Sequence, residues 1–245
     1  MLTCYDALTA AVFDAHRVPV LLVGDSAAMV VLGLASTVAI TVADLLPLTA
    51  AVRRATRRCL VVADLPFGSY EASPQQALGS AVRFLKEAGA NAVKLEGGRD
   101  VTEHVRALVS AGVPVMGHIG LRPQSVNALG GYRVQGRGAG ADGVLADAEA
   151  LQAAGAFAIV VEAVPADLGR QVAHVVDIPV VGIGAGPGTD AQVLVWQDLL
   201  GLTEDPAPRF VPRYAELRTT IGEAVDRWSQ DVRTGEYPGP EHSYS

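Results

Sequence analysis

The chain has 245 residues, of which 50% are hydrophobic and 18% charged, so it can bury a large core and intrinsic disorder is excluded. Its formal net charge is −7, with 26 acidic and 19 basic residues, and the basic residues form no run longer than a pair, which excludes an electrostatic surface for nucleic acid or an anionic membrane. Apolar stretches fall far short of the roughly 18 residues of a membrane span and the N-terminus lacks a signal-peptide pattern, so we expect a soluble, cytoplasmic protein.

Short apolar runs rich in valine, leucine and isoleucine recur along the chain. None alternates with polar residues, which is typical of parallel strands that are buried on both faces. In chain order, these predicted strands are Leu2–Cys4, Pro19–Val23, Cys59–Ala63, Ala92–Leu95, Val113–Met116, Ala158–Val161, Pro179–Ile183 and Pro208–Val211. Cys4 and Cys59 lie in such runs without C-x-x-C spacing, and we expect core thiols rather than a disulfide or a zinc site.

Segments with apolar residues at helical spacing separate the strands, for example Leu45–Val52 and Ala77–Ala88. The second is preceded by Ser73-Pro74-Gln75-Gln76, in which serine, proline and glutamine occupy the positions that favour a helix start. About eight strand–helix units close a parallel barrel, so the sequence predicts an α/β fold, a (β/α)8 TIM barrel. An open doubly wound sheet is the alternative, but no G-x-G-x-x-G follows the first strand.

No composition shift marks a domain boundary, so we expect residues 1–245 to form a single barrel domain. The tail, residues 229–245, is rich in turn-forming residues, and we expect it to wrap the surface or a neighbouring subunit. The longest stretch without periodicity is Leu121–Gly143, which contains six glycines. A loop of that length in a compact domain is usually functional.

Polar residues end several of the predicted strands. Because the carboxyl ends of barrel strands form the active site, these residues are the first candidates. They are Asp25, Ser26, Asp64, Lys94, Glu96, His118 and Glu162.

Asp25 and Asp64 follow successive predicted strands, so their carboxylates are placed to share one hard cation, and oxygen ligands favour Mg²⁺ over zinc. Glu96 is expected to join them by holding a metal-bound water. The alternative is that each aspartate caps the following loop or helix. For Glu96, a plain salt bridge with a neighbour fits the spacing equally well.

The chain has only two lysines, Lys86 and Lys94, and Lys94 lies inside an apolar run where a charged amine needs a partner. It is two residues from Glu96 on a strand, so the two side chains should point to the same face. Lys94 could bind a substrate carboxylate or form a Schiff base. A purely structural Lys94–Glu96 pair is the third possibility.

His118 and Glu162 end later strands. His118 is followed by Gly120, which leaves room for a ligand, although a hydrogen-bonded core histidine fits the sequence as well. Glu162 lies in an apolar setting that should raise its pKa and allow it to take a proton from carbon. The alternative for Glu162 is a cap on the helix that begins at Pro165.

Several motifs resemble those of the ketopantoate hydroxymethyltransferase (3-methyl-2-oxobutanoate hydroxymethyltransferase) family, in the same order and over nearly the whole chain. They are Val23-Gly24-Asp25-Ser26, Ala63-Asp64-Leu65-Pro66-Phe67, Val93-Lys94-Leu95-Glu96-Gly97-Gly98, Gly117-His118-Ile119-Gly120-Leu121, Pro123-Gln124-Ser125-Val126-Asn127, Gly130-Gly131-Tyr132-Arg133-Val134-Gln135-Gly136-Arg137, Gly182-Ile183-Gly184-Ala185-Gly186 and the ending Tyr237-Pro238-Gly239 with Glu241-His242-Ser243.

The resemblance implies a Mg²⁺-dependent TIM barrel that transfers a hydroxymethyl group from 5,10-methylenetetrahydrofolate to 3-methyl-2-oxobutanoate. The product is 2-dehydropantoate, for pantothenate and coenzyme A biosynthesis, and the reaction passes through an enolate that Mg²⁺ stabilises. The resemblance further implies a cytoplasmic homodecamer.

Carried over by position, the resemblance gives each candidate residue a role. Asp25 and Asp64 would ligate Mg²⁺ and also contact the substrate, and Glu96 would approach the metal through water. Ser26 and Lys94 would hold the 2-oxo acid carboxylate. Glu162 would be the catalytic base, and His118 a polar contact to the substrate.

The sequence also departs from the family pattern. Gly33-Leu34-Ala35-Ser36-Thr37 stands where the family commonly has a His-Asp or Tyr-Asp pair, and Leu48 stands where it has histidine. These changes remove polar groups from the second strand–helix loop, where they could touch the substrate or shape the entrance, so the rate and the affinity for folate are open. They motivate a non-catalytic paralogue that binds a 2-oxo acid or a partner as one alternative. The chain also begins at about the first predicted strand, without the N-terminal helix usual in the family, which implies a late start or a different barrel floor and assembly.

A further alternative is another metal-dependent enzyme on the same barrel, a 2-oxo acid carbon–carbon lyase of the isocitrate lyase type. The remaining alternative is an enzyme that uses Lys94 as a Schiff-base amine.

Overall fold

The computed structural model describes residues 1–204 and 206–244. The chain divides into two compact units, Met1–Val195 and Trp196–Ser245. Within the described residues, no helix combines the length and the apolar character needed to cross a bilayer.

The first unit is built around one parallel sheet whose eight strands are hydrogen-bonded in sequence order. The strands are β1 Leu2–Thr3, β2 Val20–Val23, β3 Leu60–Asp64, β4 Ala92–Glu96, β5 Val115–Gly120, β6 Ala158–Glu162, β7 Val180–Ile183 and β8 Ala191–Gln192. A parallel bridge joins Leu2 to Leu194, so the two edges of the sheet meet. The predicted TIM barrel is confirmed.

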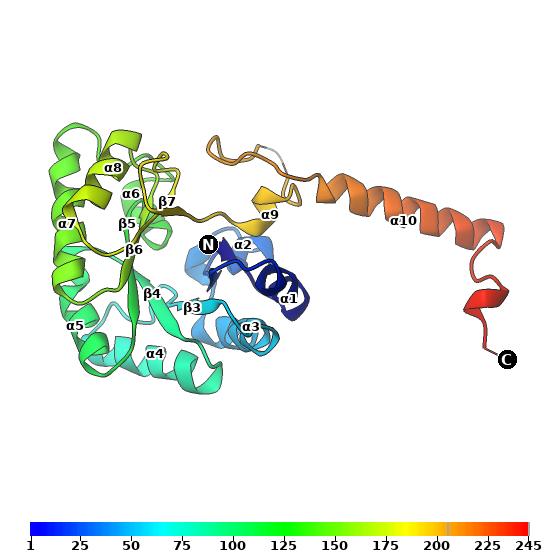
Figure 1. Ribbon diagram of the computed structural model, residues 1–245, viewed down its shortest axis with the longest axis horizontal. Helices are drawn as coiled ribbons and strands as arrows, with labels where there is room; N and C mark the ends of the chain where they lie inside the picture. Colours follow the sequence, from blue (N-terminus) through cyan, green and yellow to red (C-terminus); the bar gives the residue numbers. More distant parts are fainter. Residues whose placement is uncertain (205, 245) are drawn as a thin grey trace. The chain divides into compact units, whose positions relative to one another are not determined.

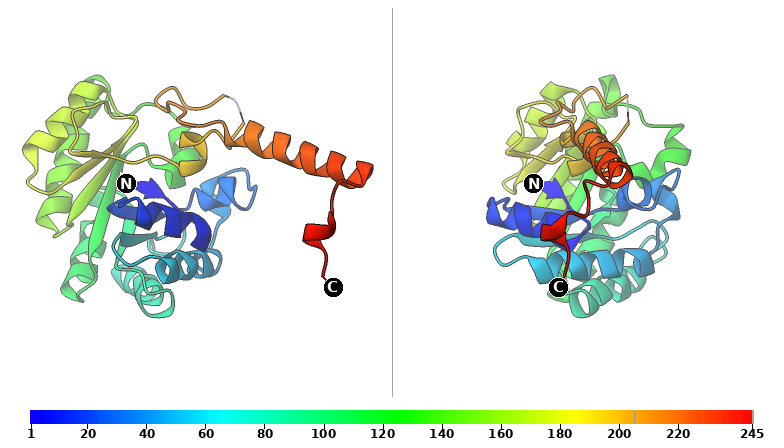
Figure 2. Two further views of the ribbon diagram at one scale, coloured as in Figure 1. Left: turned by 45° about the vertical axis from the view of Figure 1, so that its right-hand side comes forward. Right: turned by 90° about the vertical axis from the view of Figure 1, so that its right-hand side faces the viewer.

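Helices cover the outer face of this sheet (Figure 1), and the two views of Figure 2 show the same arrangement. They pack against one another in sequence, α1 on α3, α3 on α4, α4 on α5, α5 on α7 and α7 on α8. The helices of this unit are α1 Ala7–Ala15, α2 Ala27–Val30, α3 Val42–Ala55, α4 Pro74–Glu87, α5 Thr102–Ser110, α6 Val126–Leu129, α7 Ala141–Ala153 and α8 Ala166–Val175, with 3-10 turns η1 Thr37–Ala39, η2 Arg99–Val101, η3 Pro123–Ser125 and η4 Gly138–Gly140.

Local sequence explains where these helices start. Ser73 caps α4 by accepting a hydrogen bond from the Gln76 main-chain N–H, as the Ser-Pro-Gln-Gln pattern predicts. Thr41 and Asp44 form a complete capping box at the start of α3. These caps set where α3 and α4 begin, in the segments that follow β2 and β3.

The eighth strand differs from the prediction. Pro208–Val211 forms a turn in the second unit, and the eighth strand is the short segment Ala191–Gln192. Both residues are exposed, so they carry no hydrophobic signal, and they form a strand because Val181 and Gly182 of β7 pair with them. Residues 184–190 connect β7 to β8 through turns without a helix.

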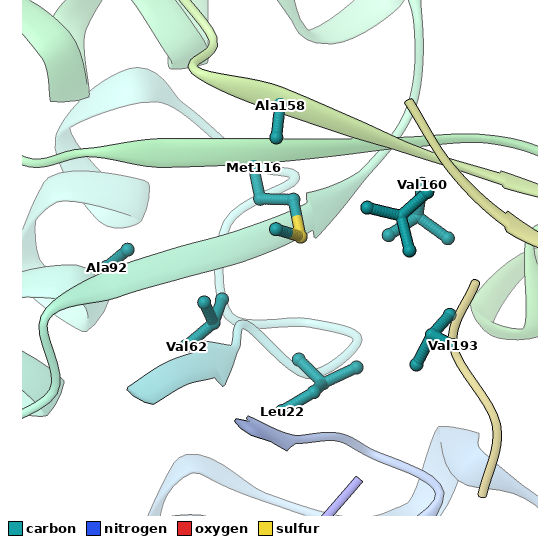
Figure 3. Close-up of a cluster of buried hydrophobic side chains, with 8 residues drawn as sticks. Leu22, Val62, Ala92, Met116, Ala158, Val160 and Val193 are labelled. Carbon is teal, nitrogen blue, oxygen red and sulfur yellow. The ribbon is translucent and has the colours of Figure 1, made fainter. Parts of the chain in front are cut away.

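The barrel interior is filled by one apolar cluster from strands β2 to β7 and the segment after β8. Its side chains point toward one another inside the curved sheet (Figure 3). The buried members are Leu22, Val62, Ala92, Met116, Ala158, Val160, Val181 and Val193. Cys4 and Cys59 are buried free thiols, as predicted.

The second unit contains α9 Trp196–Leu199, α10 Leu217–Thr234 and the 3-10 turn η5 Pro240–His242. Helix α10 has no buried residue, and it ends at Gly235, which takes the left-handed conformation of a helix C-cap. Ile221, Val225, Trp228 and Val232 form an exposed apolar stripe at helical spacing along it. The predicted wrapping role of residues 229–245 stays a prediction.

Candidate active site

The polar candidates lie on the inner face of the barrel, directly beyond the apolar cluster. Successive side chains of a strand point to opposite faces, so residues two apart share a face. On β3, β4, β5 and β6, one inward apolar residue of the cluster is followed two positions later by a polar residue. These pairs are Val62 and Asp64, Ala92 and Lys94, Met116 and His118, and Val160 and Glu162.

Four of these side chains form a continuous chain of polar contacts across four adjacent strands. Lys94 Nζ lies 2.8 Å from Asp64 Oδ1 and 3.2 Å from His118 Nδ1. His118 Nε2 lies 3.1 Å from Glu162 Oε2. Asp64, Lys94 and His118 are buried, whereas the Glu162 side chain keeps 17% of its surface exposed. Glu162 is therefore the member of this series of contacts that a substrate can reach.

Lys94 pairs with Asp64 rather than with Glu96. The strand register places Asp64 directly opposite Lys94 on the neighbouring strand. Neighbouring strands are about 4.8 Å apart, whereas residues two apart on one strand are about 6.6 Å apart. The cross-strand partner is therefore nearer, and the purely structural Lys94–Glu96 pair does not form.

The contacts define the protonation of the lysine and the histidine. Burial lowers the pKa of Lys94, but the charges of Asp64, Glu96 and Asp25 outweigh this effect and raise it overall, so the amine is an ammonium. Burial and the charge of Lys94 lower the pKa of His118 well below its ordinary value, so the imidazole is neutral. An ammonium only donates, so Nδ1 accepts from Lys94 and the imidazole proton is on Nε2, which lies close to Glu162 Oε2 without forming a hydrogen bond.

Asp25, Asp64 and Glu96 are buried, and a main-chain or side-chain amide donates to one oxygen of each. Asp25 N–H donates to Asp64 Oδ2 at 3.1 Å. Gln124 donates from Nε2 to Asp25 Oδ2 and from its main-chain N–H to Glu96 Oε2, each at 3.0 Å. Glu96 Oε1 is buried and accepts no hydrogen bond from any described residue.

Burial and crowding raise the pKa of several of these carboxyl groups. Burial, and then the charge of Asp64, raises the pKa of Asp25 to about 7. Burial and the charge of Asp25 raise the pKa of Glu96. Burial raises the pKa of Glu162 to about 7, which confirms the direction that the sequence predicts. When these carboxyl groups are ionised, their negative charge exceeds the positive charge of Lys94.

The residues fit a hard divalent cation. Asp25, Asp64, Glu96 and Glu162 share one lysine, and the donor atoms are all oxygens, which Mg²⁺ prefers. The unpaired buried Glu96 Oε1 also needs a partner. Within residues 1–204 and 206–244, no three His, Cys, Asp or Glu side chains are grouped closely enough to enclose a metal as they stand. Mg²⁺ commonly binds through one or two carboxylates and keeps several waters, which suits such an arrangement.

Ser26 lies at the start of α2, where its Oγ is 2.7 Å from the hydroxyl of the buried Tyr5. This contact holds the Ser26 hydroxyl at the carboxyl end of β2. Leu34, one of the residues that depart from the family pattern, lies in the loop after α2 and is 37% exposed. Leu48 lies within α3 and is partly buried.

The long loop Leu121–Gly143 contributes to the site, as its length predicts. It contains η3, α6 and η4 rather than irregular chain throughout. Gln124, in η3, reaches both Asp25 and Glu96. Tyr132 lies farther along, with its hydroxyl 4.0 Å from the sulfur of Met29 in α2. The loop therefore borders the inner site at one point and the β2–α3 connection at another.

Tyr5, Tyr70 and Gln124 are the site residues that sequence reasoning did not select. Gln124 stands in the Pro123-Gln124-Ser125 motif, which was the only signal for it. Tyr5 and Tyr70 follow strands in loops and give no pattern of their own. Glu162 is not the cap of α8, because the cap position is Pro165 and Glu162 faces His118 instead.

Comparison with known proteins gives the family. The family model described as ketopantoate hydroxymethyltransferase matches residues 1–240. A protein of Acidothermus cellulolyticus named 3-methyl-2-oxobutanoate hydroxymethyltransferase is 60% identical over 244 residues, covering 100% of this chain and 90% of its own. A protein of the same name from Leifsonia xyli is 56% identical over 243 residues, covering 99% and 88%.

Solved structures share the barrel at low sequence identity. Oxaloacetate acetylhydrolase with the inhibitor 3,3-difluorooxalacetate aligns with a TM-score of 0.63 and 12% identity, over 99% of this chain and 84% of its own. Phosphonopyruvate hydrolase in complex with oxalate and Mg²⁺ aligns with a TM-score of 0.62 and 14% identity, over 98% and 87%. These likenesses support the fold alone, whereas the family model and the relatives cover the whole barrel at high identity. The chain belongs to the ketopantoate hydroxymethyltransferase family.

Proposed function

We propose that this chain transfers a one-carbon unit from 5,10-methylenetetrahydrofolate to 3-methyl-2-oxobutanoate, giving 2-dehydropantoate. The membership of the family supports the reaction, and one observation of the site supports the mechanism. That observation is the chain of contacts from Asp64 through Lys94 and His118 to Glu162, which ends on a partly exposed carboxylate with a raised pKa.

We assign the cation site to Asp25 and Asp64, with Glu96 reaching the ion through water. When bound, Mg²⁺ supplies Lewis acidity to the keto and carboxylate oxygens of the substrate. The excess of buried carboxylates and the unpaired Glu96 Oε1 support this assignment. Asp25 and Asp64 also border the substrate, because they lie at the carboxyl ends of β2 and β3.

Ser26 and Lys94 are assigned to the substrate carboxylate. The Ser26 hydroxyl is held by Tyr5, so it is oriented before the substrate arrives. The Lys94 ammonium supplies positive charge, although it shares that charge with Asp64. Together they would fix the oxo acid with C3 toward Glu162.

Glu162 is assigned as the base that removes the C3 proton. Its raised pKa matches a base that works near neutral pH. The electron pair left on C3 then forms a bond to the methylene carbon of the folate. The bonds between this methylene carbon and the folate nitrogens break. Water supplies the hydroxyl oxygen, and tetrahydrofolate leaves. His118 Nε2 lies 3.1 Å from the Glu162 carboxylate, and we assign His118 as a polar contact to the substrate.

Isotope exchange at C3 tests this proposal most directly. Incubation of 3-methyl-2-oxobutanoate in D₂O without folate should wash out the C3 proton only when both enzyme and Mg²⁺ are present. Exchange that is equally fast with a chelator would contradict the metal assignment. No exchange under any condition would favour the non-catalytic paralogue that Leu34, Ala35 and Leu48 motivate.

The lyase and the Schiff-base enzyme would each give a distinct outcome. A carbon–carbon lyase of the isocitrate lyase type would cleave a carbon–carbon bond of its substrate with folate omitted, whereas the proposed transferase forms product only with folate present. A Schiff base on Lys94 would be trapped by borohydride and the 2-oxo acid. The protonated state of Lys94 and its contact with Asp64 make it a poor nucleophile, so we expect no adduct.

We further propose that the chain self-associates through α10, toward the homodecamer and cytoplasmic location that the family resemblance implies. The stripe of Ile221, Val225, Trp228 and Val232 supports an interface, because exposed apolar side chains at one helical face commonly mark one. Trp228→Glu should lower the mass measured by light scattering. An unchanged mass would contradict this role of α10.

A further inference from the structure

Gln124 occupies an unusual position among the carboxylates assigned to the cation. It is 4% exposed and lies in η3, in the loop after β5. Its side-chain Nε2 donates to Asp25 Oδ2 and its main-chain N–H donates to Glu96 Oε2, each at 3.0 Å. One residue therefore holds one oxygen of two different carboxylates, which come from the ends of β2 and β4.

The direction of the Gln124 amide is fixed by its surroundings. Nε2 also donates to the Leu65 main-chain oxygen at 3.0 Å, so the –NH₂ group faces two acceptors, Asp25 and Leu65. With the amide turned over, its oxygen would face those two oxygens and the site would lose both hydrogen bonds. The donor therefore always points at Asp25.

Tyr70 supports the other side of the same amide. This tyrosine is 2% exposed, and its hydroxyl lies 2.8 Å from Gln124 Oε1 and 3.0 Å from the Glu96 main-chain oxygen. The hydroxyl proton is shared between two acceptors, so Oε1 of Gln124 faces a donor only when Nε2 faces Asp25. Tyr70 and Gln124 thus reinforce one orientation.

We infer that Gln124, backed by Tyr70, is a positioning residue that sets the affinity of the cation site by orienting Asp25 and Glu96. This inference rests on the proposed cation site. A hydrogen bond from an amide to one oxygen fixes the plane of a carboxylate and leaves the other oxygen for a different partner. Groups that hold metal-binding carboxylates in this way change metal affinity when they are removed, by about 10–100-fold.

The side chain and the main chain of Gln124 act separately, which makes the inference testable. Gln124→Met keeps the length and the main-chain N–H to Glu96 but removes the donor to Asp25. Mg²⁺ affinity, measured by calorimetry on the full chain without substrate, should fall about 10–100-fold. Because the defect lies in binding, excess Mg²⁺ should restore turnover, which a merely structural defect would not allow.

Gln152→Met is a matched control. Gln152 Oε1 accepts hydrogen bonds from the main-chain N–H groups of Asp177 and Ile178, which precede β7 at the amino end of the barrel. This variant also loses hydrogen bonds made by a glutamine side chain, yet its Mg²⁺ affinity should equal that of the wild type. Equal affinity in Gln124→Met and Gln152→Met would overturn the inference.

Tyr70→Phe tests the same inference if Gln124→Met does not fold, because this variant removes only one hydroxyl group. Its Mg²⁺ affinity should fall by about 2–10-fold, the range for a single neutral hydrogen bond. Affinity equal to the wild type would then overturn the inference. A wild-type protein that binds no Mg²⁺ would overturn the cation site and the inference with it, whereas equal affinities among proteins that do bind would overturn the inference alone.

Discussion

His118 Nε2 lies 3.1 Å from Glu162 Oε2, across the neighbouring strands β5 and β6. Lys94 donates to the opposite ring nitrogen, so the imidazole proton is on Nε2. The neutral imidazole is a polar neighbour of Glu162 that does not neutralise its charge. Because Nε2 forms no hydrogen bond with Glu162, the carboxylate stays available to take a proton from the substrate.

Glu162→Gln tests the base directly. The amide has the same shape but takes up no proton, so C3 exchange should fall by about 10²–10⁴-fold, the usual contribution of a positioned base. Glu162 is not among the proposed ligands, so Mg²⁺ affinity should stay near that of the wild type. Proton exchange by NMR and calorimetry measure the two quantities, and substantial residual exchange would point to a different base.

The pH dependence of C3 exchange should report the raised pKa of Glu162. Burial raises this pKa to about 7, the charge of Lys94 opposes the shift and that of Asp64 adds to it, and the neighbouring His118 ring is neutral. A base works in its ionised form, so kcat/KM should increase as the pH rises through about 7 and level off above it. Below that value the rate should fall about tenfold per pH unit. A rising limb near 4.5, the ordinary glutamate value, would contradict the effect of burial. The pH profile should be measured at saturating Mg²⁺.

His118→Phe replaces the polar ring atom that lies 3.1 Å from Glu162 with an apolar one and keeps a ring of similar size. An ionised carboxylate that exchanges a polar neighbour for an apolar one is less well stabilised, so the rising limb of the pH profile should move upward by about one pH unit. Mg²⁺ affinity should change little. A rate loss with the limb unmoved would mean that His118 acts on the substrate rather than through Glu162.

Asp25→Asn should stabilise the metal-free protein. The pKa of Asp25 is raised to about 7 by burial and by Asp64, so its ionised form is unfavourable in the fold above that pH. Asparagine carries no charge and can still accept a hydrogen bond from Gln124. At pH 8 without Mg²⁺ the midpoint of thermal unfolding should rise by at least about 2–4 °C, which corresponds to about 1 kcal/mol for a chain of this size. Added Mg²⁺ should stabilise the wild type and leave this variant unchanged.

Asp64→Asn should have the opposite effect on stability. It removes the closest counter-ion of the buried Lys94, and breaking a buried ion pair costs about 3–5 kcal/mol. The unfolding midpoint should fall, and Mg²⁺ affinity should fall as well. Metal affinity equal to that of the wild type in Asp64→Asn and Glu162→Gln alike would contradict the assignment of Asp64 as a ligand.

The strands and their polar ends follow from local sequence. Runs such as Ala158–Val161 are apolar throughout because both faces of a barrel strand are buried, and this pattern needs no knowledge of neighbours. Asp64, Lys94, His118 and Glu162 then stand out as polar residues on the inward face. The capping pattern at Ser73 is local in the same way.

The partners of these residues do not follow from local sequence. Lys94 pairs with Asp64 because the register of β3 and β4 places them opposite one another, although Glu96 is nearer along the chain. Gln124 reaches Asp25 across 99 positions of sequence, and only the packing of η3 against the carboxyl end of the barrel brings them together.

The sequence by itself determined the parallel barrel, the inward position of its acidic and basic side chains, and the family, because each depends on runs and spacings within a few residues. The tertiary structure decided which of those side chains touch, where the barrel closes, and which ring nitrogen of His118 carries the proton. Ala191–Gln192 became the last strand, in place of the more apolar Pro208–Val211, because hydrogen bonds to β7 were available to it. Contacts between strands depend on register and pairing, which arise only when distant segments pack together.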